Sequence, residues 1–225
     1  MDVRIGSRRD QGGGYDSLDL DTDRGLVRAR YYPVPGARKA TILVGGVGGD
    51  FDSPSRGLYP RLCRSLQDSG IAALRVQFRN ATDLDEAVHD VLAGMHILVD
   101  EGFRIFALVG HSFGGPVVIR AAVEDERVLT VVTLATQRHG TDEVARLGPR
   151  CSILLIHGAQ DDVVPLSSSI YVHDVAWQPK KMIIYDRARH DLDEVADDVF
   201  RETCRWLAEK LEFEIAGAPA TPLAP

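Results

Sequence analysis

The sequence has little cysteine, no excess of positive charge and no long apolar run. Its three cysteines, Cys63, Cys151 and Cys204, are far apart and include no C-x-x-C pair, so they predict neither a disulfide framework nor a zinc site. The net charge of −7 argues against a nucleic-acid partner, whose binding surface is usually basic. No run approaches the roughly 20 apolar residues of a membrane span, and the N-terminus lacks the apolar core of a signal peptide. We therefore expect a cytoplasmic protein that binds neither nucleic acid nor membrane.

The length and composition of the chain fit one folded domain. The chain of 225 residues is as long as a single α/β domain, and its 44% of hydrophobic and 26% of charged residues are ordinary for a globular protein. Residues 1–14 are charged and end in three glycines, so we expect a flexible leader there. We expect the domain over 15–213. The segment 214–225 is rich in proline and alanine, which predicts a disordered tail.

Two hydrophobic patterns predict the fold. Apolar and polar residues alternate over 17–20 and again over 27–31, with a turn containing glycine between them, which predicts an antiparallel hairpin. Farther along, short continuous apolar runs predict strands buried on both faces. These runs are 41–44, 72–76, 105–109, 130–134, 153–156 and 182–184. Stretches with helical spacing separate them, and the last helix is expected from about Leu192 to Leu211. The sequence predicts an α/β fold, with a mostly parallel central sheet, helices on both faces and an antiparallel N-terminal hairpin.

One of these strands leads into the motif G-x-S-x-G, present as Gly110-His111-Ser112-Phe113-Gly114. In a nucleophile elbow, a serine stands on a tight turn between a strand and a helix. Gly110 and Gly114 fit that turn, because the chain on either side of it comes too close for Cβ atoms. A serine before a helix is also a common N-cap. The motif alone therefore leaves both interpretations open for Ser112.

An acid and a histidine follow in the order of a serine hydrolase, each after a strand. The run 153–156 is followed by His157-Gly158-Ala159-Gln160-Asp161-Asp162-Val163-Val164-Pro165, and the run 182–184 by a loop ending in His190. From about residue 40 to 212 the chain therefore resembles the α/β-hydrolases, in particular the small, lid-poor, dienelactone-hydrolase-like members. The segment from His157 to Pro165 resembles the family pattern H-G-x-x-D-x-x-V-P, which implies that Asp161 is the acid, with Asp162 as the alternative.

The resemblance implies a role for each member of this set. Ser112 would be the nucleophile, His190 its base, and Asp161 the acid that orients the histidine. His111 and His157, which adjoin the motifs, would support the site without taking part in the chemistry.

The resemblance also implies an oxyanion hole made of backbone N–H groups. Phe113 would supply one donor. The glycine-rich segment 45–49 aligns with the family pattern H-G-x-G-G, so Val47 would supply the other, with Gly46 as second choice. Gly45 stands where many relatives have histidine, and Ser112 stands where dienelactone hydrolases have cysteine. Because of the second departure, the resemblance supports an ester-cleaving serine hydrolase better than it supports dienelactone as the substrate.

Gly46, Arg56, Tyr59 and Arg79 lie near predicted strand ends and are candidate substrate contacts; an arginine there would bind a carboxylate. We expect a carboxylesterase that acts on small or short-acyl esters through an acyl-enzyme, with no metal and no organic cofactor. The same triad leaves peptidase, thioesterase and acyltransferase activity open. A non-catalytic binding protein is a further alternative, and the sequence predicts no oligomeric state.

Overall fold

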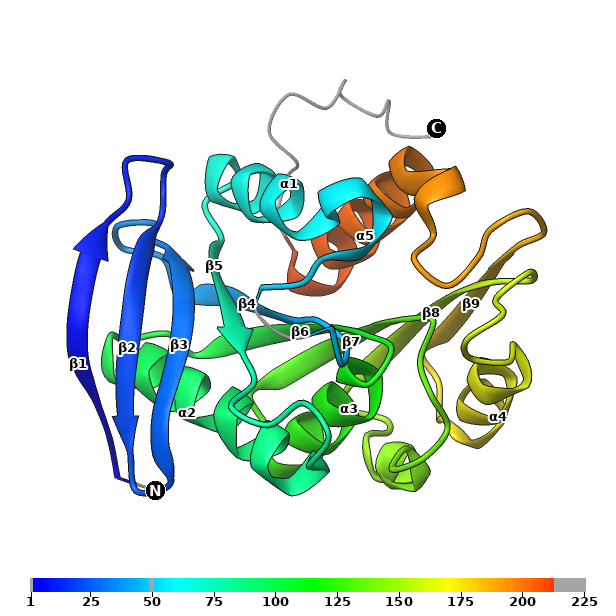
Figure 1. The fold of residues 1–225 in the computed structure, drawn as a ribbon, viewed down its shortest axis with the longest axis horizontal. Helices are drawn as coiled ribbons and strands as arrows, with labels where there is room; N and C mark the ends of the chain where they lie inside the picture. The colour runs from blue at the N-terminus through cyan, green and yellow to red at the C-terminus, as the bar shows by residue number, and fades with distance from the viewer. Residues whose placement is uncertain (1, 49–50, 213–225) are drawn as a thin grey trace.

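One mixed sheet forms the frame of the molecule. We describe the protein from a computed structural model that places residues 2–48 and 51–212. The strands are β1 (Val3–Asp10), β2 (Asp16–Thr22), β3 (Gly25–Tyr32), β4 (Lys39–Val44), β5 (Ala72–Gln77), β6 (Ile105–His111), β7 (Val128–Leu134), β8 (Ser152–Gly158) and β9 (Lys180–Tyr185). Within the described ranges they form one nine-stranded sheet in the order β1-β2-β3-β5-β4-β6-β7-β8-β9 (Figure 1). The strands from β5 to β9 in this order are parallel, and β1, β2 and β3 pair antiparallel. The predicted parallel sheet with an N-terminal hairpin is confirmed.

Helices cover both faces of this sheet. They are α1 (Pro54–Asp68), α2 (Leu84–Asp100), α3 (Gly114–Glu124), α4 (Ser167–Val175) and α5 (Ala196–Leu211), with short 3₁₀ helices at Asp142–Arg146 and Asp193–Val195. α1 and α5 pack on one face, and α2, α3 and α4 pack on the other (Figure 1). Successive residues of a strand point to opposite faces, so Ile42 joins the core under α2 and α3 while Leu43 joins the core under α1 and α5. Burial on both sides explains the continuous apolar runs.

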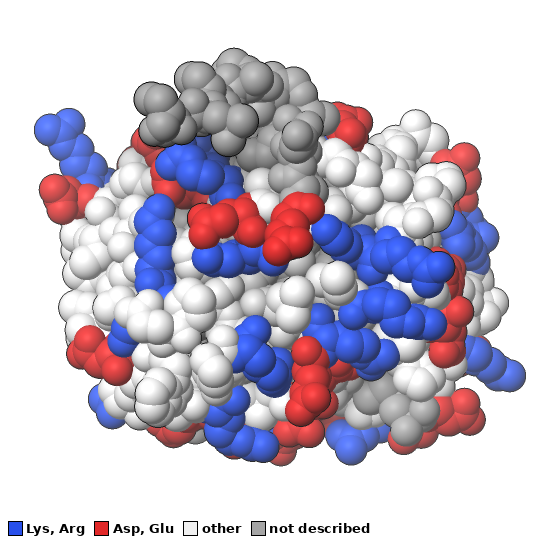
Figure 2. All heavy atoms as spheres, turned by 180° about the vertical axis from the view of Figure 1, so that it is seen from behind, with Lys and Arg blue, Asp and Glu red and all other residues white. Residues whose placement is uncertain are grey.

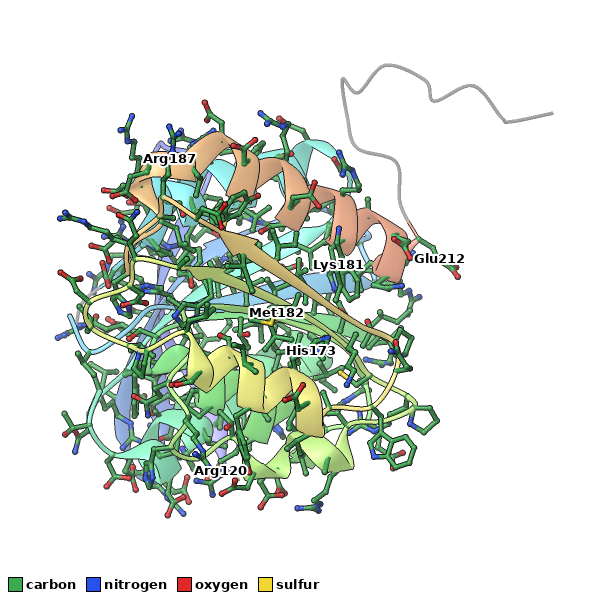
Figure 3. All side chains as sticks on the ribbon, turned by 90° about the vertical axis from the view of Figure 1, so that its right-hand side faces the viewer. Arg120, His173, Lys181, Met182, Arg187 and Glu212 are labelled. Atoms are coloured by element: carbon green, nitrogen blue, oxygen red, sulfur yellow. The ribbon has the colours of Figure 1, made fainter. Side chains whose placement is uncertain are left out.

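The last strand, β9, shows the same alternation at the edge of the sheet. Figure 3 shows it crossing between α5 and α4. The Lys181 Nζ lies 2.9 Å from a carboxylate oxygen of Glu202 on α5, whereas Met182 packs against the core that includes Val172 of α4. Because β4, β6, β8 and β9 are parallel, their carboxyl ends lie at one edge of the sheet. The loops that follow them carry the predicted site.

The expected leader over 1–14 is wrong for most of its length, because residues 3–10 form β1 at the other edge of the sheet. Val3 is the one buried residue of β1, so the sequence of this strand has no alternation of apolar and polar residues that would predict it. Polar contacts with β2 hold it instead, such as Ser7 to Asp19 at 2.7 Å and Arg8 to Asp16 at 2.6 Å. A strand at a sheet edge can be polar on both faces.

Two further boundaries differ from expectation or lie beyond the structure. The last helix begins at Ala196 rather than near Leu192, because Leu192 has a left-handed φ of 58° and a 3₁₀ turn precedes the helix. The expected tail over 214–225 lies outside the described residues. The extent of a single domain over 15–213 stays a prediction.

Charges of both signs are interspersed on the face seen in Figure 2, with arginine and lysine side chains beside aspartate and glutamate. Ion pairs of the structure, irrespective of the face on which they lie, include Arg127 with Asp125 at 2.5 Å and Arg8 with Glu101 at 3.2 Å. Among residues 2–48 and 51–212, no helix combines the length and the apolar composition needed to cross a bilayer.

Candidate active site

Ser112 stands on a strained turn between β6 and α3. Its φ of 55° lies in the left-handed region, which a residue with a side chain rarely adopts. A Cβ at Gly110 would overlap the carbonyl oxygen of Gly114, and one at Gly114 would lie 2.5 Å from the carbonyl oxygen of Gly45. Both glycines are therefore required by close packing of backbone. α3 has Phe113 at its N-cap and no side-chain capping bond, so Ser112 does not act as a helix cap.

The structure brings Ser112, His190 and Asp161 together. The His190 Nε2 lies 3.0 Å from the Ser112 Oγ, and its Nδ1 lies 2.8 Å from the Asp161 Oδ2. Asp162 is exposed and makes no such contact within the described residues, so the acid in place is Asp161. An imidazole between a carboxylate and a hydroxyl can accept the hydroxyl proton, because the carboxylate fixes the N–H on the far ring nitrogen.

The carboxylate of Asp161 is surrounded by donors. Its Oδ1 accepts from the backbone N–H of Val163 at 2.9 Å and of Val164 at 2.8 Å, while its Oδ2 faces His190. Burial favours the protonated acid, but the N–H of Val164, the His190 ring and the N–H of Val163 together outweigh it and lower the pKa of Asp161. The carboxylate is therefore charged at neutral pH.

The loop after β8, which carries Asp161 (the acid loop), lies against the loop after β9, which carries His190 (the base loop). The N–H of Gln160 donates to the carbonyl of Ala188 at 3.0 Å, and that of Ala159 donates to Tyr185 at 2.9 Å. A Cβ at Gly158 would overlap the Ala188 carbonyl oxygen. Glycine at the end of β8 therefore allows the close approach that places His190 against Asp161.

His111, just before Ser112, contacts the loop that carries His190. The residue is 2% exposed, and its Nε2 lies 3.2 Å from the His190 carbonyl oxygen. A carbonyl only accepts, so Nε2 carries the proton and donates. Burial, with a further contribution from the nearby His190, lowers the pKa of His111, so the ring is neutral. Its Nδ1 is buried and has no partner within the described part of the chain.

The glycine-rich loop after β4 packs directly against Ser112. A Cβ at Gly46 would lie 3.2 Å from the Ser112 Cβ and 3.6 Å from its Oγ. Within residues 2–48 and 51–212, the backbone N–H groups of Val47 and Phe113 have no acceptor. These two N–H groups follow Gly46 and Ser112 directly in the chain, and these two residues lie against each other. Gly45 is also explained, because a Cβ there would lie 3.0 Å from the Asp52 Cβ.

Two of the candidate substrate contacts, Arg79 and Tyr59, are hydrogen-bonded to other residues of the chain. Arg79 donates to Asp90 at 2.6 Å and to Glu86 at 2.6 Å, so these two carboxylates already neutralise its charge. Tyr59 is 1% exposed, and its hydroxyl donates to the Val44 carbonyl at 2.7 Å. These contacts do not support either residue as a substrate contact. Tyr59 instead fixes the end of β4, from which the glycine-rich loop departs.

Arg56 lies beside the base loop in acidic surroundings. It lines a hollow of about 230 Å³ with Asp193, Glu194 and Asp197. These carboxylates would repel a negatively charged substrate, so its assignment as a carboxylate-binding residue is not supported. The backbone N–H of Arg56 donates to the Asp193 Oδ1 at 2.8 Å.

Sequence reasoning missed the residues that hold the two loops carrying Asp161 and His190. Ser55, Arg56 and Gly57 all have left-handed φ angles at the start of α1, and the Ser55 N–H donates to the Asp191 carbonyl at 2.7 Å. Ser169 on α4 lies 2.6 Å from the His157 ring. The sequence carries no signal for either contact, since serine at a helix start is common and the partners are distant along the chain. No group of three or more histidine, cysteine or acidic residues suited to a metal ion occurs among the described residues.

Known proteins that are similar to this chain include one curated protein and many solved structures. No protein-family model matches the chain. Among curated proteins, the uncharacterized protein YfhR of Escherichia coli O157:H7 is 30% identical over an alignment of 116 residues that covers 45% of this chain. The chain spans only 39% of the length of that relative.

Solved structures match over nearly the whole chain. Est1E from Butyrivibrio proteoclasticus is 16% identical with a TM-score of 0.75, covering 87% of this chain and 99% of its own. A dienelactone hydrolase from Anabaena variabilis is 18% identical with a TM-score of 0.76, covering 87% and 97%. XC6422 from Xanthomonas campestris, described as an α/β serine hydrolase without lid, is 21% identical with a TM-score of 0.69, covering 92% and 97%. At these identities the likeness concerns the fold.

Proposed function

We propose that this chain, which has the α/β-hydrolase fold, is a serine hydrolase that cleaves small or short-acyl carboxylic esters through an acyl-enzyme. One observation carries the proposal: a continuous hydrogen-bonded chain from Asp161 through His190 to the Ser112 Oγ, with links of 2.8 Å and 3.0 Å. The residues come from three separate loops, and the serine is held in a strained backbone conformation. Strain at a serine that a histidine also contacts is typical of a nucleophile.

In the first half of the reaction, Ser112 attacks the ester carbonyl carbon while His190 Nε2 takes the hydroxyl proton. Asp161 stabilises the imidazolium that forms. The negative charge that develops on the carbonyl oxygen is stabilised by the N–H groups of Phe113 and Val47, and losing one such donor typically lowers turnover about 10²–10³-fold. His190 then protonates the departing alkoxide, leaving an ester between the acyl group and Ser112.

In the second half, water replaces the alcohol. His190 takes a proton from the water as its oxygen attacks the acyl carbon, and it returns that proton to Ser112 as the carboxylic acid leaves. The exposed apolar side chains near the triad suit an ester with apolar groups. Val47 and Val163 are 61% and 67% exposed, and they adjoin the proposed oxyanion donor and the acid, respectively.

A substrate panel tests this function. Purified protein and its Ser112→Ala variant are assayed on p-nitrophenyl esters of increasing acyl length, on matched amides and on matched thioesters. We expect hydrolysis of the short esters, and a loss of at least about 10³-fold in Ser112→Ala. Preference for the amides or thioesters would replace the esterase assignment. Absence of turnover on every substrate by the folded wild type would contradict it and favour a binding role.

A further inference from the structure

We propose that His157 and Ser169 form a positioning pair that holds Asp161, the acid of the triad. This inference rests on the proposed function, since it concerns how Asp161 is held for catalysis. The pair lies under the acid loop, between the end of β8 and the start of α4. Neither residue touches Ser112 or a substrate position, and both are fully buried.

The contacts link the pair to both oxygens of the acid. The His157 Nε2 donates to the Val164 carbonyl at 3.1 Å and lies 3.1 Å from the Asp161 Oδ2. The N–H of Val164 in turn donates to the Asp161 Oδ1 at 2.8 Å. His157 therefore acts on the acid by two routes: it fixes the residue that binds one carboxylate oxygen, and it places an N–H dipole beside the other.

The Val164 carbonyl and the Asp161 carboxylate determine which ring nitrogen of His157 carries the proton, and the hydroxyl of Ser169 satisfies the other nitrogen. Both oxygens facing the His157 Nε2 only accept, so this nitrogen is the donor and the Nδ1 is an acceptor in the neutral ring. Ser169 lies 2.6 Å from that Nδ1 and donates its hydroxyl proton to it. Burial lowers the pKa of His157, which keeps the ring neutral although a carboxylate lies beside it. Ser169 thus orients His157 much as Asp161 orients His190.

A comparison of two neighbouring serines tests the pair. Ser169→Ala removes the hydroxyl that faces His157. Ser168→Ala is the matched control, because Ser168 is adjacent on α4 and 5% exposed, and its hydroxyl makes no hydrogen bond within the described ranges. Both variants are assayed for kcat/KM on the best ester as a function of pH. We expect about a threefold to tenfold loss in Ser169→Ala and less than a twofold change in Ser168→Ala.

A shift of the acid limb of the pH profile separates positioning from general support. Without the Ser169 donor, the N–H of His157 is no longer held beside the Asp161 Oδ2, so the carboxylate attracts the His190 imidazolium more strongly. The acid limb of the profile should then move up by about half a pH unit. If the carboxylate is no longer held and moves away from His190, the limb moves down instead. An acid limb that stays where it is in the wild type overturns the proposal.

Histidine side-chain ¹⁵N spectra give a readout that does not depend on activity. In the wild type at about pH 7, His157 should be neutral with its proton on Nε2, and Ser169→Ala should change the signal of its Nδ1. A protonated ring, or a proton on Nδ1 in the wild type, contradicts the pair whatever the enzyme turns over. Normal His157 signals in a protein without esterase activity would reject the proposed function and leave the hydrogen-bonded pair standing. If Ser169→Ala does not fold, Ser169→Cys gives the same comparison with a weaker donor.

Discussion

His111 and His157 are two buried histidines that occupy equivalent places in the site, but their surroundings differ. Each stands at the end of a parallel strand, and each uses its Nε2 to hold a backbone carbonyl of a catalytic loop: His190 at 3.2 Å and Val164 at 3.1 Å. The Nδ1 of His157 faces Ser169 at 2.6 Å, whereas the Nδ1 of His111 has no partner among the described residues. The acid side of the site is fully hydrogen-bonded, and the base side is not.

The difference shows where the site tolerates change. A buried polar network that is fully satisfied loses several partners when one member is removed, whereas an unpartnered atom has less to lose. The acid loop should therefore be rigid and sensitive to substitution. The base loop should be easier to alter, because His111 contributes one hydrogen bond and carries an unmet acceptor.

The largest expected effect comes from removing the charge of Asp161, at the centre of the fully hydrogen-bonded acid side. In Asp161→Asn the amide has one acceptor oxygen for the donors of Val163, Val164 and His190, so His190 loses its fixed tautomer. We expect kcat to fall about 10³–10⁴-fold with the fold intact. Asp162→Asn is the control at the neighbouring exposed position, and kcat there should stay within about twofold. An active Asp161→Asn would mean that the histidine is oriented by another group.

A stability measurement compares the two histidines directly. His157→Phe leaves the Ser169 hydroxyl and the Val164 carbonyl without partners, whereas His111→Phe leaves only the His190 carbonyl and also removes the unmet Nδ1. A buried group left unsatisfied costs about 1–3 kcal/mol, so His157→Phe should lower the free energy of unfolding by roughly 1–2 kcal/mol more than His111→Phe. Urea unfolding of both variants measures this. Equal losses would show that the two sites are equivalent.

The same histidines should make the protein sensitive to mild acid. Burial lowers the pKa of both rings, with the nearby His190 adding to the effect at His111. The unfolded chain therefore binds protons first as the pH falls, so stability is complete above about pH 6.5 and declines below it, at up to about 1.4 kcal/mol per pH unit for each histidine. His111→Gln and His157→Gln should each flatten this decline. Urea unfolding at several pH values checks it, and an unchanged slope would contradict a neutral buried ring.

The smallest expected effect comes from a substitution beside the His111 Nδ1, which has no partner among the described residues. In Gly46→Ala the new Cβ would lie 3.2 Å from the Ser112 Cβ and 3.6 Å from the His111 Nδ1. Moving the glycine-rich loop by a few tenths of an ångström should lower kcat/KM by about twofold to tenfold. Gly48→Ala is the control on the same loop, because its Cβ would meet the exposed side chain of Asp52 at 3.2 Å. A greater loss in Gly48→Ala would contradict the contact between Gly46 and the nucleophile.

Much of the fold follows from sequence because its signals are local. The apolar runs of the parallel strands and the spacing of Leu58, Leu62 and Leu66 on α1 depend only on which side chains are buried. β1 escaped prediction because hydrogen bonds and ion pairs to β2 hold it, and polar contacts leave no period in the sequence. The start of α5 was misplaced because the left-handed turn at Leu192 needs a buried leucine where a glycine would be expected.

The residues of the site also divide into those with a local sequence signal and those whose partners are distant along the chain. Ser112, Asp161 and His190 occupy strand ends, where motif order along the chain is enough to select them. The surroundings of Arg79 could not be predicted, since its position near a strand end gives no sign of Asp90 and Glu86 beside it. The partnership of Ser169 with His157 depends on how α4 packs under the acid loop, which no local pattern encodes.

Labelling with a fluorophosphonate tests the central claim most directly, because the probe reacts with a serine that a neighbouring base activates. Intact-mass analysis of the labelled protein, followed by peptide mapping, identifies the modified residue. We predict one adduct per chain, on Ser112, and none in a folded Ser112→Ala variant. Equal labelling of both proteins, or no labelling of the folded wild type, would contradict Ser112 as the nucleophile.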